Sequence, residues 1–323
     1  MMDDSGSPLF TAHGGFSTAA DQWLAFISFF LLPTTNCQQY YHLLSRIQSS
    51  VNFFFQHGFC NSYGMEGPSL VILKEEAKAF IGKKILEASG ASKLDKDRIT
   101  GQTVRDLKTW GKHFLIVLDD CAIRIHYLMF GNYYINSRHP EKIPKLTMVF
   151  ENGEWNNYNC AAKIIEEDLD TLYDWSTDVM NDDWNAAKAR KKLEQNAHML
   201  VCDALLDQTI FSGVGNIMKN EILYRIYLHP ESAVGALSPQ KLDELITEAR
   251  NYAFDFYNWK KEGTLRKHWL AHTKKICQRC HLPFVKKHTG TNPRRSFFCT
   301  NCQVLYETTN GNEDPQTSGD SPK

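Results

Sequence analysis

Met65-Glu66-Gly67-Pro68-Ser69-Leu70 is the stretch at which this chain changes character. Regular apolar patterning begins at Leu70, whereas residues 1–64 are rich in Phe, Ser and Gln, carry a single basic residue, Arg46, and show no clean helix or strand period. We therefore expect residues 1–64 to be a leader that is disordered or is not part of the working protein, with an amphipathic docking helix as the alternative. The folded protein is expected to begin at Met65.

Length and composition indicate a globular protein of about two domains. The chain has 323 residues, of which 42% are hydrophobic and 23% are charged, as in ordinary water-soluble proteins. The longest apolar run, residues 23–32, is far shorter than the roughly 18 to 20 residues that span a bilayer. No basic cluster of a signal peptide precedes this run, so we expect neither secretion nor a membrane partner.

The net charge of −1 hides an uneven distribution. Residues 151–183 contain ten acidic residues against the single Lys163, whereas residues 264–306 contain nine Lys or Arg and no Asp or Glu. A basic segment of this kind is typical of a surface that binds nucleic-acid phosphates, although solvated basic faces look the same. The C-terminal part is therefore a candidate phosphate-binding surface.

Short apolar runs rich in β-branched residues follow a helical pattern over residues 71–82. They predict strands at residues 114–118, 123–128, 146–150 and near 159–164. From residue 65 to about residue 172 we therefore expect one helix leading into an antiparallel sandwich.

The pattern becomes helical from about Asp183 onward. Residues 185–206 predict one or two helices, and Ser238-Pro239 predicts the start of another, with Ser as N-cap and Pro in the first turn. The apolar face of this last helix consists of Leu242, Leu245, Ile246, Ala249, Tyr252, Ala253 and Phe256. The tail, residues 307–323, is polar and rich in Gly, Pro and Ser, which is typical of disorder.

Four of the nine cysteines have the spacing Cys-x2-Cys-x18-Cys-x2-Cys, and they are Cys277, Cys280, Cys299 and Cys302. Four thiolates complete the tetrahedral shell of a structural Zn²⁺ ion, so this spacing predicts a zinc site without an open position. A pair of redox disulfides is the alternative, but no strand-helix context of thioredoxin type surrounds the motifs. Between the two pairs, Arg294 and Arg295 are suited to bind phosphate oxygens or base edges.

A second segment, residues 206–216, reads as a helix end, a turn with two glycines and a new helix over residues 216–225. Gly213 and Gly215 allow positive φ and close backbone approach, and the free amides of a helix N-terminus attract anions. Asn216 is suited to serve as N-cap or to donate to a phosphate. An ordinary corner between two helices would use the same residues.

Together these motifs resemble the formamidopyrimidine-DNA glycosylase and endonuclease VIII family of base-excision repair enzymes, over about three quarters of the chain. The matching segments, in chain order, are Glu66-Gly67-Pro68, Gly111-Lys112, residues 126–131, residues 206–230 and residues 294–303. The resemblance implies an α+β fold. Its expected parts are a catalytic β-sandwich domain with its N-terminal helix (65–182), a helix-two-turns-helix domain (183–263) and a zinc ribbon (264–306), followed by the tail.

The resemblance also implies roles for single residues. Glu66 is similar to the acid that protonates the sugar oxygen, and Lys112 to the lysine that holds the phosphate beside the lesion. Asn216 and Arg294 resemble the pair that clamps the same phosphodiester. Met129 lies where the family places a wedge that fills the hole left by a flipped nucleotide, although a Met between Leu and Phe is also typical of a core. The implied partner is double-stranded DNA with a damaged base or an abasic site, bound by a monomer in the cytoplasm or nucleoid of a bacterium or in a eukaryotic nucleus.

Met65 departs from the family pattern, because members normally carry an N-terminal Pro whose amine attacks the deoxyribose C1′. An amide nitrogen within a chain cannot form the resulting imine, whereas a free α-amino group, with a pKa near 8, can. Two hypotheses follow: a glycosylase and abasic-site lyase whose chain starts at Met65, or a damaged-DNA binding protein that does not cleave. The short segment 265–276 resembles the endonuclease VIII branch and favours oxidised pyrimidines over purines.

Overall fold

The computed structural model describes residues 65–308, so the expected leader and most of the expected tail lie outside the described residues. The first element is helix α3 (Gly67–Glu76), which continues into a 3-10 turn, η1 (Ala77–Phe80). The predicted helix over residues 71–82 was therefore placed too late. Pro68 in the first turn explains the earlier start, because its fixed φ suits a helix and its missing N–H is not needed there.

Six strands follow and form one antiparallel sheet with the order β1-β5-β6-β4-β3-β2. They are β1 (Glu87–Ser89), β2 (Asp106–Trp110), β3 (His113–Val117), β4 (Ala122–Ile135), β5 (Leu146–Phe150) and β6 (Gly153–Ile165). The predicted strands are confirmed, but β4 and β6 are much longer than their apolar runs because polar residues continue the ladder.

The sheet folds over itself at an irregularity in β4. Phe114 pairs with Ile125 of β4, and Trp155 pairs with Ile135 of the same strand. The two β4 residues are ten positions apart, which corresponds to about 33 Å along a straight strand. The rings of Phe114 and Trp155 nevertheless lie 5.3 Å apart. The pairing of β4 with β6 shifts register between Tyr127 and Asn132, and this bend lets the two ends of one sheet enclose a shared apolar core.

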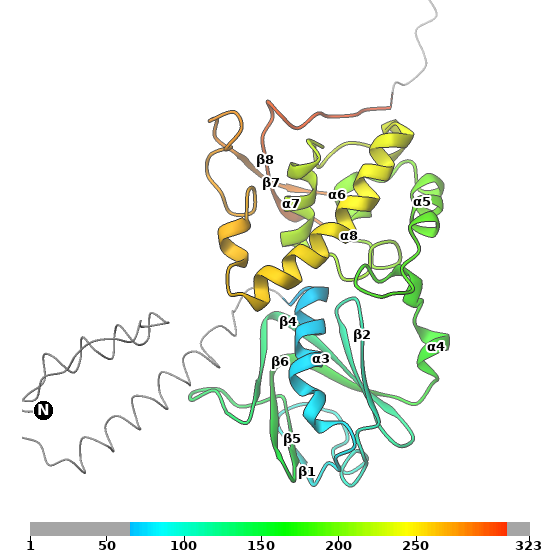
Figure 1. The fold of residues 1–323 in the computed structure, drawn as a ribbon, viewed down its shortest axis with the longest axis vertical. Coiled ribbons are helices and arrows are strands. Elements are labelled where there is room, and N and C mark those ends of the chain that lie inside the picture. The colour runs from blue at the N-terminus through cyan, green and yellow to red at the C-terminus, as the bar shows by residue number, and fades with distance from the viewer. Residues whose placement is uncertain (1–64, 309–323) are drawn as a thin grey trace, which may run out of the picture. The chain divides into compact units, whose positions relative to one another are not determined.

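The second half of the described chain is helical (Figure 1). Its helices are α4 (Leu169–Leu172), η2 (Trp175–Thr177), α5 (Ala186–Gln195), α6 (Val201–Ala204), α7 (Asn216–Arg225), η3 (Val234–Ala236), α8 (Pro239–Lys261) and η4 (Leu265–His268). The Ser238 hydroxyl accepts a hydrogen bond from the Lys241 amide, which confirms the predicted cap of α8, and the predicted apolar face of α8 is buried. No described helix is long and apolar enough to span a membrane.

A two-stranded hairpin, β7 (Val285–Thr289) and β8 (Arg294–Phe298), packs against α7. Figure 1 shows α3 running along the sheet toward α8, and the two helices are joined by polar contacts. Lys260 donates to the Ser69 hydroxyl at 2.7 Å, and Lys261 forms an ion pair with Glu75 at 2.7 Å. The start of α3 is thereby brought to the helical half, which places Glu66 beside α7.

Candidate active site and metal centre

A cleft of about 1,090 Å³ collects most of the residues that the sequence singled out. Its walls come from the start of α3, the turn between β2 and β3, strand β4, the start of α7 and the tip of the β7-β8 hairpin. The predicted site residues that line it are Met65, Glu66, Lys112, Met129, Gly215, Asn216 and Arg294. Residues more than 220 positions apart in the chain therefore face one cavity.

Glu66 lies at the floor of this cleft with only 5% of its surface exposed. Its carboxylate accepts hydrogen bonds from the amides of Ile217 and Met218, at 2.8 and 3.2 Å, so it caps α7 from another part of the chain. Burial raises the pKa of Glu66 above its ordinary value, although the charge of Lys112 and the α7 amides pull that pKa down. The carboxyl group is thus suited to hold a proton and to donate it.

The two glycines before α7 are needed for close packing. A Cβ on Gly215 would lie 2.4 Å from the carboxyl carbon of Glu66, and only a glycine leaves that space free. Gly213 has φ of +98° and approaches the Cα of Gly67, while its carbonyl accepts from the Gly67 amide at 2.9 Å. From the sequence, the free amides at the start of α7 were expected to attract an external anion. In the structure the amides of Ile217 and Met218 donate to the carboxylate of Glu66 instead.

Lys112 is the second residue of the two-residue turn between β2 and β3. Trp110 pairs with His113, which leaves Gly111 and Lys112 as the turn. Burial lowers the pKa of Lys112, the charge of Glu66 raises it, and the nearby Arg294 lowers it further. Two cations that face one cleft in this way are suited to share a single anionic ligand.

Asn216 occupies the first turn of α7, but it is not the N-cap that the sequence allowed. Gly215 takes the cap position, and the Glu66 carboxylate does the capping. The side-chain amide of Asn216 donates to the Arg295 carbonyl at 3.1 Å, while its Oδ1 is buried and has no hydrogen-bond partner among residues 65–308. Asn216 therefore links α7 to the strand that carries Arg294.

The hairpin that presents Arg294 is fixed by polar contacts with α6 and α7. Asp203 of α6 accepts from the amide and the hydroxyl of Thr291 at the tip. Lys219, fully buried in α7, donates to the Ser296 hydroxyl at 2.8 Å, and burial lowers the pKa of Lys219 to about 8. The guanidinium of Arg294 itself is exposed, so the support holds the backbone and leaves the charge available.

Met129 projects from the bend in β4 and is 67% exposed, next to Leu128 at 46% and Phe130 at 60%. The alternative of a core methionine is thereby excluded. Phe130 has φ of +65°, and the Asn159 side chain donates to the Met129 carbonyl, so the backbone is held in an unusual shape that turns three apolar side chains outward.

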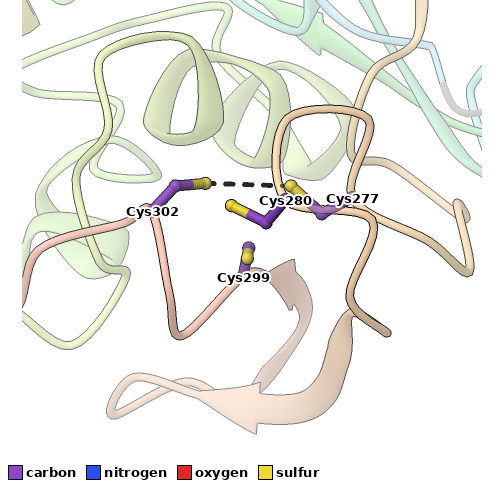
Figure 2. A group of neighbouring side chains, drawn as sticks. All are labelled: Cys277, Cys280, Cys299 and Cys302. Atoms are coloured by element: carbon purple, nitrogen blue, oxygen red, sulfur yellow. Dashed lines mark hydrogen bonds between the residues drawn. The ribbon is translucent and has the colours of Figure 1, made fainter.

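The four predicted cysteine ligands converge from two segments, as Figure 2 shows. All four sulfur atoms lie within 4.8 Å of one another, and those of Cys277 and Cys302 are 3.8 Å apart. Tetrahedral coordination with bonds of about 2.3 Å requires sulfur separations of about 3.8 Å, so the set fits one metal ion. The side chain of Asn301 donates to the Cys280 sulfur at 3.2 Å, which suits a thiolate.

Several residues that shape the cleft were not singled out from sequence. Trp110 and His113 line it, and burial together with Arg124 and His126 lowers the pKa of His113 to about 4. Asp178, 3% exposed, accepts from the Gly111 amide. A lone aspartate in an acidic stretch carries no signal in one sequence, and only the fold shows that it is buried.

Models of known protein domains match both the strand-rich half and the helical half of this fold. Residues 72–163 match the model of the formamidopyrimidine-DNA glycosylase N-terminal domain, and residues 175–253 match its H2TH domain. The formamidopyrimidine-DNA glycosylase of Oceanobacillus iheyensis is 30% identical over 207 residues, which cover 57% of this chain and 74% of that protein. Endonuclease 8-like 3 of Xenopus laevis is 28% identical over 242 residues, which cover 68% of this chain but 38% of the relative, so the chain spans well under half of that longer protein.

Solved structures show the same fold. A viral DNA glycosylase superposes with a TM-score of 0.66 at 20% identity, covering 74% of this chain and 100% of the other. A Lactococcus lactis formamidopyrimidine-DNA glycosylase, bound to DNA containing an AP site, gives a TM-score of 0.66 at 23% identity over 74% and 99% of the two chains. The family models, the relative at 30% identity and the order of the motifs agree: this chain belongs to the formamidopyrimidine-DNA glycosylase and endonuclease VIII family.

Proposed function

We propose that this protein is a base-excision DNA glycosylase with abasic-site lyase activity. The observation that carries the proposal is the single cleft in which a buried proton donor, Glu66, faces two cations, Lys112 and Arg294, and the residue before it, Met65. The partner is double-stranded DNA with a damaged base or an abasic site. Residues 65–182, 183–263 and 264–306 serve as catalytic, helix-two-turns-helix and zinc-ribbon domains.

In the proposed reaction, a free α-amino group on Met65 attacks C1′ of the damaged nucleotide, and the damaged base leaves with a proton as the bond between C1′ and the base breaks. Glu66 protonates the sugar oxygen, so the bond between C1′ and this oxygen breaks and the ring opens into an imine as the nitrogen loses its remaining proton. Elimination from this imine cuts the strand. Lys112, Asn216 and Arg294 hold the phosphate, Gly213 and Gly215 allow the close approach that supports this grip, and Met129 fills the space left by the extruded nucleotide. Oxidised pyrimidines are the preferred bases.

The cysteine cluster is proposed to hold a structural Zn²⁺ ion, bound by Cys277, Cys280, Cys299 and Cys302. Two buried cysteines, Cys277 and Cys299, and four sulfur atoms that all lie within 4.8 Å of one another support this assignment. The ion contributes no chemistry to base removal. It braces the hairpin that carries Arg294 toward the DNA.

Borohydride trapping on abasic-site DNA tests the proposal. A chain that begins at Met65 is expected to form a covalent adduct at the Met65 nitrogen, whereas the chain that begins at Met1 is expected to form none. A chain that begins at residue 65 with Met65→Pro restores the family's usual amine and serves as the positive control. An adduct that maps to Lys112 or another internal lysine overturns the assignment of the nucleophile, and damage-specific binding without any adduct favours the second hypothesis, a non-cleaving damaged-DNA binding protein.

Lesion preference is tested by competition between duplexes that contain an oxidised pyrimidine and duplexes that contain 8-oxoguanine. Faster release of the pyrimidine is expected. Faster release of 8-oxoguanine contradicts the preference while leaving the reaction class intact.

A further inference from the structure

The carboxylate of Asp178 is buried and does not line the cleft that holds Glu66. Asp178 follows η2 in the segment that connects the strands to the helices, and 3% of its surface is exposed. One of its oxygens accepts from the Gly111 amide at 2.8 Å, and the other accepts from the Met180 amide at 2.9 Å. Both carboxylate oxygens are therefore used to hold backbone.

The Gly111 amide belongs to the turn that presents Lys112. Gly111 has φ of +53°, and a Cβ there would lie 2.1 Å from the Ser212 hydroxyl and 3.0 Å from the Gly213 nitrogen. This turn thus packs backbone to backbone against the turn before α7. On the other side of the turn, Nδ1 of His126 lies 3.0 Å from the Lys112 carbonyl oxygen.

The backbone around Asp178 is fixed from two further elements. The Ser212 amide donates to the Thr177 carbonyl at 2.8 Å, and the Val179 amide donates to the Ser212 carbonyl at 3.1 Å. Arg250 of α8 donates to the Val179 carbonyl at 3.3 Å and to the Asn181 carbonyl at 3.0 Å. Asp178 therefore connects the turn that carries Lys112 to a segment whose own backbone is held by Ser212 and Arg250.

We propose that Asp178 is a positioning residue that fixes the Gly111-Lys112 turn against the segment before α7, so that Lys112 faces Glu66 and Arg294 across the cleft. This inference rests on the proposed function where it concerns the phosphate grip of Lys112. Its structural part, the fixation of the turn, stands on the contacts alone.

The fixation depends on pH. Burial raises the pKa of Asp178 to about 6, while the amides of Met180 and Gly111 and the charge of Arg250 lower it. Asp178 lines a second cavity, distinct from the cleft of Glu66. Charged groups of α3, β2, α4 and the Asp178 segment also line this second cavity, namely Lys74, Asp106, Lys108, Asp170, Asp182 and Asp183. Because the folded protein raises this pKa above the ordinary value of Asp, opening of the turn is expected to become less favourable as pH falls through about 6.

Asp178→Asn in the full chain tests the structural part without DNA. The Asn side chain keeps one accepting oxygen and loses the other, so hydrogen exchange of the Gly111 amide is expected to rise at least 10-fold at pH 7.5. In the wild type no such rise is expected between pH 7 and pH 5, after correction for intrinsic exchange. Asp178→Glu is expected to restore part of the protection, and Asp182→Asn, an exposed neighbour, is the matched control.

Binding of abasic-site DNA tests the functional part. Asp178→Asn is expected to lower the slope of log K against log salt by about 0.9, as loss of one phosphate contact does, and to weaken binding roughly 10-fold at 0.1 M salt. Lys112→Ala is expected to do the same, and the double variant to be no worse than either single one. Unchanged Gly111 exchange in Asp178→Asn, or additive effects of the two substitutions, overturns the inference. A wild type that does not bind abasic-site DNA overturns the proposed function, whereas the exchange comparison still decides whether Asp178 fixes the turn.

Discussion

Glu66 shows how a residue at the start of a helix becomes suited to donate a proton through contacts far away in the chain. Removal from water favours the neutral acid, and the partial positive charge at the N-terminus of α7 favours the anion. Burial is the larger effect, so the pKa is raised, yet the amides fix the carboxyl group in one place. The same buried environment therefore fixes the position of the Glu66 carboxyl group and raises its pKa.

Glu66→Gln removes the transferable proton while keeping the size of the side chain. For a chain that begins at Met65, base release is expected to fall by roughly 10² to 10⁴, the usual worth of general acid catalysis. The wild-type rate is expected to decline as pH rises through the raised pKa of Glu66, since the protonated form is lost there. The variant is expected to lack this decline, as measured by single-turnover rates between pH 5 and pH 9. Glu87→Gln, on the exposed end of β1, is the control, and a retained decline in Glu66→Gln contradicts the role.

Gly215→Ala tests the steric part of the same site. Gly215 has φ of −121°, so alanine meets no backbone strain, and its only cost is the collision with the carboxyl group of Glu66. We expect a loss of stability of about 1 to 3 kcal/mol, as for an overpacked core, together with a loss of base release. Gly101→Ala, at a positive φ with no neighbour within 4 Å, is the comparison. It is expected to lower stability in urea titration without slowing base release, and equal rates for both variants contradict the expected displacement of Glu66.

At the scale of elements, α7 joins the two sites. Its N-terminal amides hold Glu66, and at its C-terminal end Arg279, from the turn between two cysteine ligands, donates to the Tyr224 carbonyl at 2.7 Å and to the Arg225 carbonyl at 3.2 Å. The guanidinium of Arg279 also lies 3.7 Å from the ring centroid of Tyr227. The cysteine cluster thus caps the helix whose N-terminal amides hold Glu66 at the floor of the cleft.

Removal of the metal by a chelator is therefore expected to loosen α7 and the β7-β8 hairpin and to spare the sheet. Hydrogen exchange followed by peptide mass analysis is expected to show faster exchange in residues 216–225 and 285–298, and unchanged exchange in β3 and β4. Binding of abasic-site DNA is expected to weaken at the same time, and added Zn²⁺ is expected to restore both properties. Uniform acceleration across the sheet contradicts this division.

The bounds of an element could be predicted from sequence where neighbouring residues determine them. They could not be predicted where a contact with a distant part of the chain determines them. The cap of α8 by Ser238 and the exact range of α7 follow from local chemistry. The length of β4 and the bend after Tyr127 depend on partners 20 to 43 residues away, and the cap of α7 by Glu66 depends on a partner 151 residues away. The cleft residues were found because each motif carries its own chemistry, whereas Asp178 and Lys219 gain their roles only through burial.

At the scale of the whole molecule, the net charge of −1 alone does not favour binding to a polyanion such as DNA. The distribution of charge along the chain does favour it. The basic C-terminal part contributes Arg294, the turn between β2 and β3 contributes Lys112, and both face one cleft. Because counterion release depends on local contacts, binding is expected to be strongly salt-dependent despite the neutral total. The acidic residues of 151–183 lie in and around β6 and in the segment that follows it, and none of them lines the cleft.

Lys112→Ala together with Arg294→Ala tests this separation between local and total charge. If each cation neutralises one phosphate, the slope of log K against log salt is expected to fall by about 1.8, which is twice the 0.9 of a single contact. Lys191→Ala with Lys286→Ala removes the same charge from exposed positions that do not line the cleft, and it is expected to change the slope by less than about 0.5. Fluorescence anisotropy of abasic-site duplexes between 0.05 and 0.3 M salt measures both slopes. Equal slopes for the two double variants would show that the general field of the protein, rather than the cleft, attracts the DNA.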